Sequence, residues 1–152
     1  KRMRPIRVLA VLLLSVGWLA AQNPLSGTWK LNPSKSKFPP PAPQSETAYI
    51  QADDDNFQMK DEITDAKGTT LHVTWDAKFD GKEYPVLGDP SSDSISLKRV
   101  DANTFKAILK KSGKVVSDST IVVSGDGKTT TVNFVDTSQA APANGTAVYD
   151  KQ

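Results

Sequence analysis

Short runs of alternating apolar and polar residues fill most of the chain from residue 46 onward, and this rhythm limits the possible folds more than any other feature. It predicts nine strands, most of them separated by only a few residues. The turn signals between them, Asp80-Gly81 among them, are rich in Asp, Asn and Gly, which supply the positive φ that tight hairpins require. No window shows a long helical period. The expected strands are 27–31, 46–52, 56–63, 69–79, 94–100, 103–111, 114–124, 128–136 and 145–151.

Strands connected in this way predict an all-β fold, an antiparallel up-and-down meander. Such a meander removes its exposed edges most simply by closing into a barrel, so we expect eight to ten strands and no helical lid. The stretch Tyr84-Pro85-Val86 is a candidate for one further short strand. A sandwich of two sheets is the alternative.

The alternation also predicts which side chains point inward, because successive residues of a strand face opposite sides of the sheet. In the segment 71–79 the odd-numbered residues are apolar, whereas the even-numbered ones are polar. Similar patterns occur in the segments 27–31, 95–99 and 103–109. The expected inward residues of these four segments are Trp29, Leu31, Leu71, Val73, Trp75, Ala77, Phe79, Ile95, Leu97, Arg99, Phe105, Ala107 and Leu109.

The segment 32–45 differs from the rest in its proline content. Its five prolines are Pro33, Pro39, Pro40, Pro41 and Pro43. Because proline inside a helix costs about 3 kcal/mol, we expect no helix here but an extended, polyproline-like strap across the surface. Many small barrels place a helical lid at this point of the chain.

Residues 1–21 resemble a secretory signal peptide. Four basic residues precede an apolar run that ends in Ala20-Ala21. This run of about 14 residues is shorter than the roughly 20 that a membrane span needs. We therefore expect cleavage near Ala21, no stable membrane anchor afterwards, and a periplasmic or secreted protein.

The remaining segment, 22–152, is expected to form one domain. It carries 15 Lys and Arg against 17 Asp and Glu, a formal net charge of −2, and its basic residues are scattered. Nucleic acid is therefore an unsuitable partner. The chain has no cysteine, which excludes disulfides and thiolate metal sites. We expect a monomer.

Catalytic and metal-binding motifs are weak. His72, the single histidine, falls on the polar face of its strand, so a surface imidazole is expected rather than a base or a zinc ligand. The run Asp53-Asp54-Asp55-Asn56 lacks the ligand spacing of a calcium loop and is expected to be a turn. Gly125-Asp126-Gly127 precedes a strand rather than a helix, so it is expected to be a hairpin turn rather than a phosphate loop. We expect no enzymatic activity, no metal and no cofactor.

A small hydrophobic molecule inside the barrel is the most suitable ligand. Arg99 would contact such a ligand if it pointed inward, although it also ends its strand and could emerge at the rim. Tyr149 offers a hydroxyl group on an apolar side chain. The candidate ligand-binding residues are Trp29, Trp75, Phe79, Arg99, Phe105 and Tyr149.

Several short motifs resemble those of a known superfamily. The runs GTWKL at 27–31, DGK at 80–82 and 126–128, and GTAVYDKQ at 145–152 resemble the calycins, with the fatty-acid-binding proteins nearest in style. The runs GTWKLNPSKSKF, DGKEYPVLG, SLKRVDANTFKA and GDGKTTTV resemble small exported bacterial proteins that are called lipocalin-like. This likeness covers nearly all of 22–152. It implies a barrel of eight to ten strands with an internal site for an apolar molecule.

The chain departs from these families at their ligand-binding residues. Fatty-acid-binding proteins hold the ligand carboxylate with an arginine and a tyrosine two residues apart in the last strand. Matching that motif places Tyr149 at the tyrosine but Ala147 at the arginine. Lipocalins commonly stack an arginine of the last strand on the tryptophan of their Gly-x-Trp motif, which here is Trp29. The only cation of the last strand in this chain is Lys151.

Two functions follow as hypotheses. The first is an exported, non-enzymatic carrier that binds a small hydrophobic molecule inside the barrel. The second is an interaction or structural module with a filled interior, which would act through its surface, including the proline strap. A small enzyme is the third and weakest reading.

Overall fold

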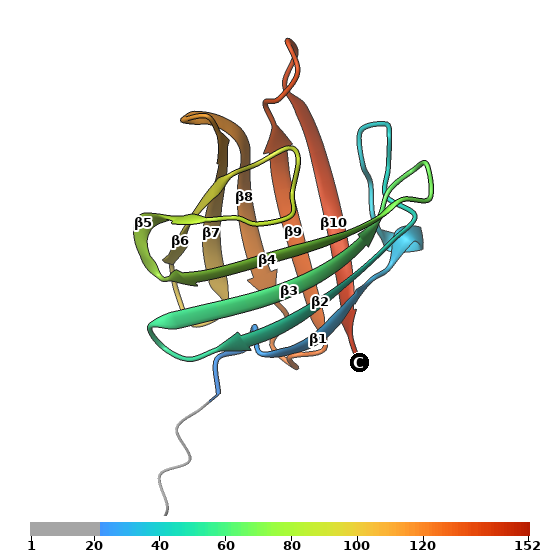
Figure 1. Cartoon of the computed structure of the whole chain (residues 1–152). Helices are drawn as coiled ribbons and strands as arrows, with labels where there is room; N and C mark the ends of the chain where they lie inside the picture. The colour runs from blue at the N-terminus through green and yellow to red at the C-terminus, as the bar shows by residue number, and fades with distance from the viewer. Residues whose placement is uncertain (1–21) are drawn as a thin grey trace, which may run out of the picture.

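The computed structural model describes residues 22–152, which form ten antiparallel strands and almost no helix (Figure 1). The predicted signal peptide, 1–21, lies outside the described residues. No helix within 22–152 is long and apolar enough to cross a membrane. The strands are β1 (Gly27–Leu31), β2 (Ser45–Ala52), β3 (Asn56–Thr64), β4 (Thr70–Lys78), β5 (Asp80–Pro85), β6 (Ser94–Arg99), β7 (Thr104–Lys111), β8 (Lys114–Val123), β9 (Thr129–Asp136) and β10 (Ala143–Lys151).

The strands form one sheet in the order β4-β3-β2-β1-β10-β9-β8-β7-β6-β5. Every neighbouring pair is antiparallel, and β1 joins the last strand, β10. The sheet curls until its two outer strands approach each other, which makes a nearly closed barrel (Figure 1). The prediction of an all-β, up-and-down barrel is thus confirmed, with one sheet in place of the two-sheet alternative.

The tenth strand is β5, in the region where the sequence left one further strand open. Tyr84 and Pro85 belong to it, and Tyr84 pairs with Ile95 of β6. The expected turn at Asp80-Gly81 is wrong in detail, because Asp80 already begins β5 and pairs with Lys98. The register then shifts between Asp80 and Glu83, so the turn residues are absorbed into an irregular strand start.

The seam between β4 and β5 is closed by a short segment that follows β5. Leu87 forms an isolated antiparallel bridge with Thr74 of β4, and each backbone N–H donates to the other residue's carbonyl at 2.9 Å. Val86 beside it is buried. This bridge provides the backbone pairing that edge strands of an open sheet would lack.

Apart from Arg99, which is described below, the side chains that the alternation placed inward belong to the barrel core. The buried set includes Trp29, Val73, Leu97, Phe105 and Ala107. Aromatic rings gather at one end of the barrel, here called the packed end: Phe79 lies 5.9 Å from Phe57 and 5.3 Å from Phe105 between ring centroids. Phe79 and Phe105 are not part of the wall of the cavity described below.

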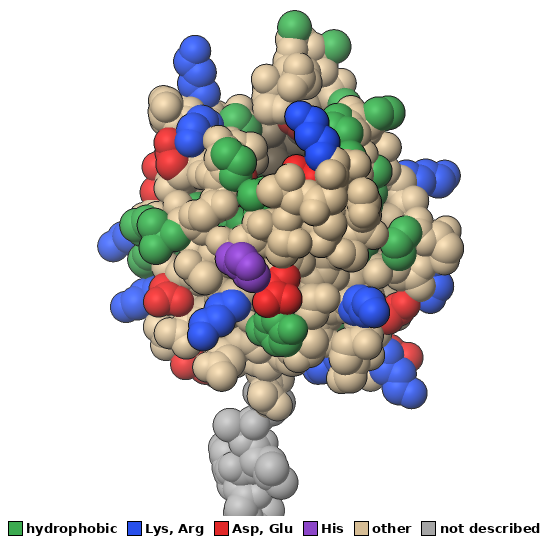
Figure 2. Space-filling view, turned by 45° about the vertical axis from the view of Figure 1, so that its right-hand side comes forward, with side chains coloured by type: hydrophobic (Ala, Val, Ile, Leu, Met, Phe, Trp, Pro, Cys, Tyr) green, Lys and Arg blue, Asp and Glu red, His purple; other side chains and the backbone are tan. Residues whose placement is uncertain are grey.

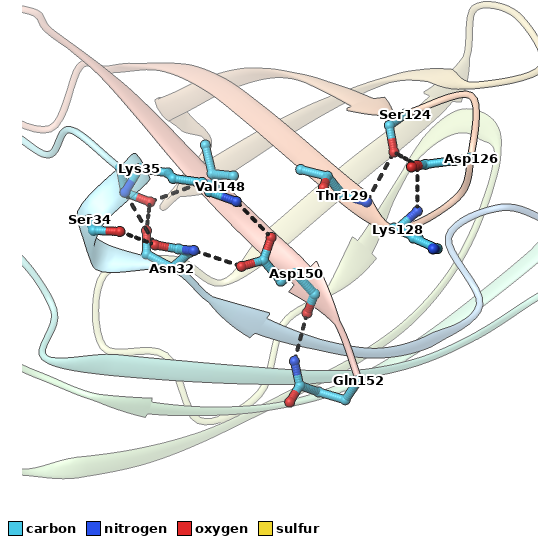
Figure 3. A network of polar contacts seen from close by, with 11 residues as sticks. Asn32, Ser34, Lys35, Ser124, Asp126, Lys128, Thr129, Val148, Asp150 and Gln152 are labelled. Carbon is cyan, nitrogen blue, oxygen red and sulfur yellow. Dashed lines mark hydrogen bonds and ion pairs between the residues drawn. The ribbon is translucent and has the colours of Figure 1, made fainter.

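The proline-rich strap runs from β1 to β2 and is held against β10. The expectation that it contains no helix is wrong for one turn, the 3-10 helix η1 (Pro33–Lys35), because proline suits the first position of a helix. Asn32 donates to the Asp150 carboxylate at 2.6 Å, and Lys35 pairs with the same carboxylate at 3.5 Å (Figure 3). Further along, Lys37 exchanges two backbone hydrogen bonds with Thr146, each at 2.7 Å.

Gly88, next to the closing bridge, should not tolerate a side chain. Its φ is +86°, and an added Cβ would collide with the backbone oxygen of His72 on β4. We expect Gly88→Ala to destabilise the fold by about 2 kcal/mol or more, because it adds backbone strain and displaces the Thr74–Leu87 bridge. Urea denaturation of the variant and of the unmodified protein measures the difference.

Gly81→Ala is the matched control for this prediction. Gly81 also has a positive φ, +76°, but a Cβ added there would meet no atom within 4 Å. Its cost should be limited to the strain, about 1 kcal/mol. Equal costs at the two positions would contradict the role assigned to the close approach at Gly88.

Candidate functional site

A cavity of about 270 Å³ lies inside the barrel. Its wall is mainly apolar, with large rings beside small side chains such as Ala48 and Ala107. Figure 2 shows a hollow in the molecular surface near the upper end, with acidic side chains beside it. The lining residues are Leu25, Trp29, Glu46, Ala48, Ile50, Phe57, Met59, Asp61, Ile63, Val73, Trp75, Val86, Asp89, Ser92, Ile95, Ala107, Leu109, Ser119, Ile121, Thr130, Val132 and Tyr149.

The structure divides the six candidate ligand-binding residues into two groups. Trp29, Trp75 and Tyr149 line the cavity. Phe79 and Phe105 pack into the aromatic cluster at the packed end of the barrel and do not line the cavity. Arg99, the sixth, lies beside that cluster and also does not line the cavity.

Of the two positions considered for Arg99, inside the barrel against a ligand or at the rim, the structure shows the rim. Its guanidinium bonds to the Asp54 carboxylate, 3.2 Å away, and to the carbonyl oxygens of Asp101 and Ala102, also at 3.2 Å. The guanidinium carbon lies 5.6 Å from the centre of the Phe105 ring. Arg99 therefore caps the packed end of the barrel, and its hydrogen-bonding groups are turned towards the turns there.

Trp29 forms part of the cavity floor. Its indole N–H donates to the carbonyl of Leu25 at 2.7 Å, so the polar group of the buried ring is satisfied. The ammonium of Lys151 lies 5.1 Å from the indole ring centre, within the range of a cation–π contact. The cation of the last strand thus lies over the ring of Trp29.

Two acidic residues on the inner face are not among the candidate residues predicted from the sequence. Glu46 and Asp61 both line the cavity, and Asp61 is only 5 % exposed. Strand phase could have found them. Asp61 alternates in step with Phe57, Met59 and Ile63, and Glu46 is in phase with the buried Ala48.

These acids form a chain of contacts with Tyr149. The Tyr149 hydroxyl donates to a Glu46 carboxylate oxygen at 2.9 Å. In the strand register, Tyr149 of β10 lies opposite Leu31 of β1, and the next strand is β2, which carries Glu46. The tyrosine thus reaches across β1 to the acid. Both the burial of its ring and the charge of Glu46 raise the pKa of Tyr149 well above its usual range, which keeps the hydroxyl as a donor.

Burial sets the protonation of the acid pair. Burial, then the charge of Glu46 and the hydrogen bond to its carboxylate, raise the pKa of Asp61 to about 9. Burial also raises the pKa of Glu46, although hydrogen bonds from Tyr149 and Asp61 oppose this. Two neighbouring carboxyl groups cannot both ionise in such a site without a large cost. Burial therefore favours the protonated forms of both acids, and at neutral pH Asp61 keeps its proton and donates it to Glu46.

Two polar atoms of the cavity wall have no hydrogen-bond partner within the described residues. They are the Oδ1 atom of Asp61 and the hydroxyl oxygen of Thr130. Both residues are 5 % exposed and both line the cavity. Buried polar atoms are nearly always paired, so each atom is suited to a polar group that enters the cavity from outside the chain. The two atoms lie on different parts of the wall, because β2, β1 and β10 separate β3 from β9.

The other motifs considered above lie on the surface. The side chain of His72 is 70 % exposed and faces Glu62 at 3.8 Å. Asp53 accepts backbone N–H bonds from Asp55 and Asn56, as in a tight turn. Gly127 closes the expected hairpin turn with a bond to the Ser124 carbonyl at 2.9 Å. No cluster of three or more potential ligands within 22–152 is placed to hold a metal ion.

The fold and site define a nearly closed, all-β antiparallel barrel with an apolar cavity and one polar wall. This architecture is compatible with a calycin-like fold. Comparison with protein-family models, with curated proteins and with solved structures finds no match to the chain.

Proposed function

We propose that this protein is an exported, non-enzymatic binding protein that holds a small, mainly apolar molecule inside its barrel. The observation that carries the proposal is the cavity of about 270 Å³ with rings on its wall. Barrels of about eight strands lie at the boundary between a filled core and a cavity for one small ligand, and a ten-strand barrel is wider. The signal-like residues 1–21 support the export part of the proposal. The proposal includes no cofactor and no nucleic acid.

The wall combines the features of known small-molecule sites. Such sites are concave and mostly apolar, with a few polar groups that orient the ligand. Trp29 and Trp75 supply large apolar surfaces, and the Glu46–Asp61 pair with Tyr149 supplies a polar group. We propose these residues as ligand contacts, and we propose that Phe79, Phe105 and Arg99 support the site from the packed end.

Filling the cavity with a larger side chain tests the proposal. Ala107 lines the cavity, so Ala107→Leu should project into empty space. We expect the variant to fold with unchanged or slightly higher stability and to bind the fluorescent probe N-phenyl-1-naphthylamine about tenfold more weakly than the unmodified protein. Fluorescence titration and urea denaturation give the two values.

Ala77→Leu is the matched control, because Ala77 is equally buried but does not line the cavity. There the extra atoms meet a packed core and should cost about 1–3 kcal/mol. If Ala107→Leu costs as much, the interior is filled and the surface-acting module becomes the better reading. If the unmodified protein does not bind the probe, the carrier function is contradicted as well.

A further inference from the structure

The polar wall of the cavity carries negative charge without a matching cation. Among the described residues that line the cavity, three are acidic, namely Glu46, Asp61 and Asp89, and none is Lys, Arg or His. Asp89 is already bonded to Ser91 and Ser92. None of the ion pairs in 22–152 involves Glu46 or Asp61. A buried carboxylate is costly unless it is paired, so the missing partner is a cation.

The acceptors on this wall fit a group with several N–H donors. Glu46 offers a carboxylate and Asp61 offers its unpartnered Oδ1. Tyr149 already donates to Glu46 and keeps that carboxyl group in place. A primary ammonium has three donors and one positive charge. It can therefore donate to both acids at once, and it supplies the positive charge that the lining residues lack.

The same wall opposes a carboxylate. A fatty acid would bring its negative charge towards Glu46, and the arginine position of the fatty-acid clamp is occupied by the buried Ala147. An alcohol could donate one hydrogen bond to Asp61 but would leave the Glu46 charge unpaired. A quaternary ammonium would supply the charge but no donor for the unpartnered oxygens.

We propose that the ligand is an amphipathic primary amine, whose ammonium group binds against Glu46 and Asp61 while its apolar part fills the cavity. This inference rests on the proposed binding function and names the chemical class of its ligand. It assigns a role to two side chains that were not among the candidates predicted from the sequence. It also reverses the charge preference of the fatty-acid clamp, in which the protein supplies the cation.

Four probes with the same ten-carbon tail test the inference: decylamine, decyltrimethylammonium, decanol and decanoate. Isothermal titration calorimetry at neutral pH should rank decylamine first, about tenfold tighter than decanol and decyltrimethylammonium. Decanoate should bind most weakly. In Glu46→Gln, decylamine should lose its advantage over decanol, whereas the affinity for decanol should change little.

The outcomes separate the inference from the function on which it rests. If decanol, decanoate or decyltrimethylammonium binds as tightly as decylamine, the cavity binds apolar tails and the amine preference is wrong. If none of the four probes binds, both the amine preference and the proposed carrier function are wrong. The ranking on the unmodified protein decides the matter even if Glu46→Gln does not fold.

Discussion

Replacing Asp61 by asparagine should stabilise the folded protein, and the gain should grow as the pH rises from about 4 to about 9. The pKa of Asp61 rises from its usual 3.8 to about 9 in the folded state. Between these values the unfolded chain releases a proton that the folded protein keeps. Stability therefore falls with increasing pH, by up to about 1.4 kcal/mol per pH unit.

The variant should remove this slope, because asparagine has no proton to release and its amide can still donate to Glu46. The groups that face Asp61 are Glu46 from β2 and Tyr149 from β10, with Glu62 next to it on β3. At pH 8 we expect Asp61→Asn to be more stable by about 2 kcal/mol or more, and near pH 4 by almost nothing. Urea denaturation across this pH range measures both.

Asp76→Asn makes the same chemical change at an exposed position of β4 and serves as the control. It should alter stability by no more than about 0.5 kcal/mol at any pH. A gain for Asp61→Asn that does not depend on pH would contradict the burial of a protonated carboxyl group at this site.

Replacing Phe105 by alanine should cost about 3–5 kcal/mol, the largest loss expected for any single side chain here. Phe105 is 0 % exposed. Its ring lies 5.3 Å from Phe79 and beneath the Arg99 guanidinium, 5.6 Å away. Removing it leaves a void in the packed end of the barrel, and the surrounding strands can collapse only in part. Urea denaturation should show a lower midpoint.

Phe38→Ala removes the same atoms from the proline-rich strap. Phe38 is half-buried, and its ring contacts Phe134 at 5.8 Å. A loss of about 1 kcal/mol is expected, because less apolar area leaves water there on folding. If the two variants lose equal stability, the packed end of the barrel is not the main support of the fold.

The fold could be predicted from the sequence because each level of the pattern agrees with the others. The period of two, the short turns and the absence of a helical period each favour an antiparallel meander, and closure removes its edges. The start of β5 could not be predicted, since its register shift depends on pairing with β6. The helical turn η1 was not predicted either, because the five prolines favoured an extended strap. The signal for it was Asn32, whose side chain accepts a hydrogen bond from the backbone N–H of Lys35 and caps the turn.

The site was predicted only in part. Strand phase placed Trp29 and Trp75 inward, and Tyr149 was a candidate because it offers a hydroxyl group on an apolar side chain; all three line the cavity. The same rule put Phe79 and Phe105 inward, but phase gives the face of a sheet and not the height along the barrel axis. That height follows from strand tilt and register. Asp61 was in phase with its apolar neighbours, yet its charge favoured a surface position, and only three-dimensional packing identifies a buried acid.

Native mass spectrometry of the protein, purified gently from the cells that naturally produce it, tests the central claim most directly. The account predicts one bound molecule of defined mass per chain, which is lost on denaturation. It predicts also that the emptied protein takes up the same molecule from a lipid extract. A protein that carries nothing after purification and takes up nothing from the extract would contradict the claim that this barrel is a carrier.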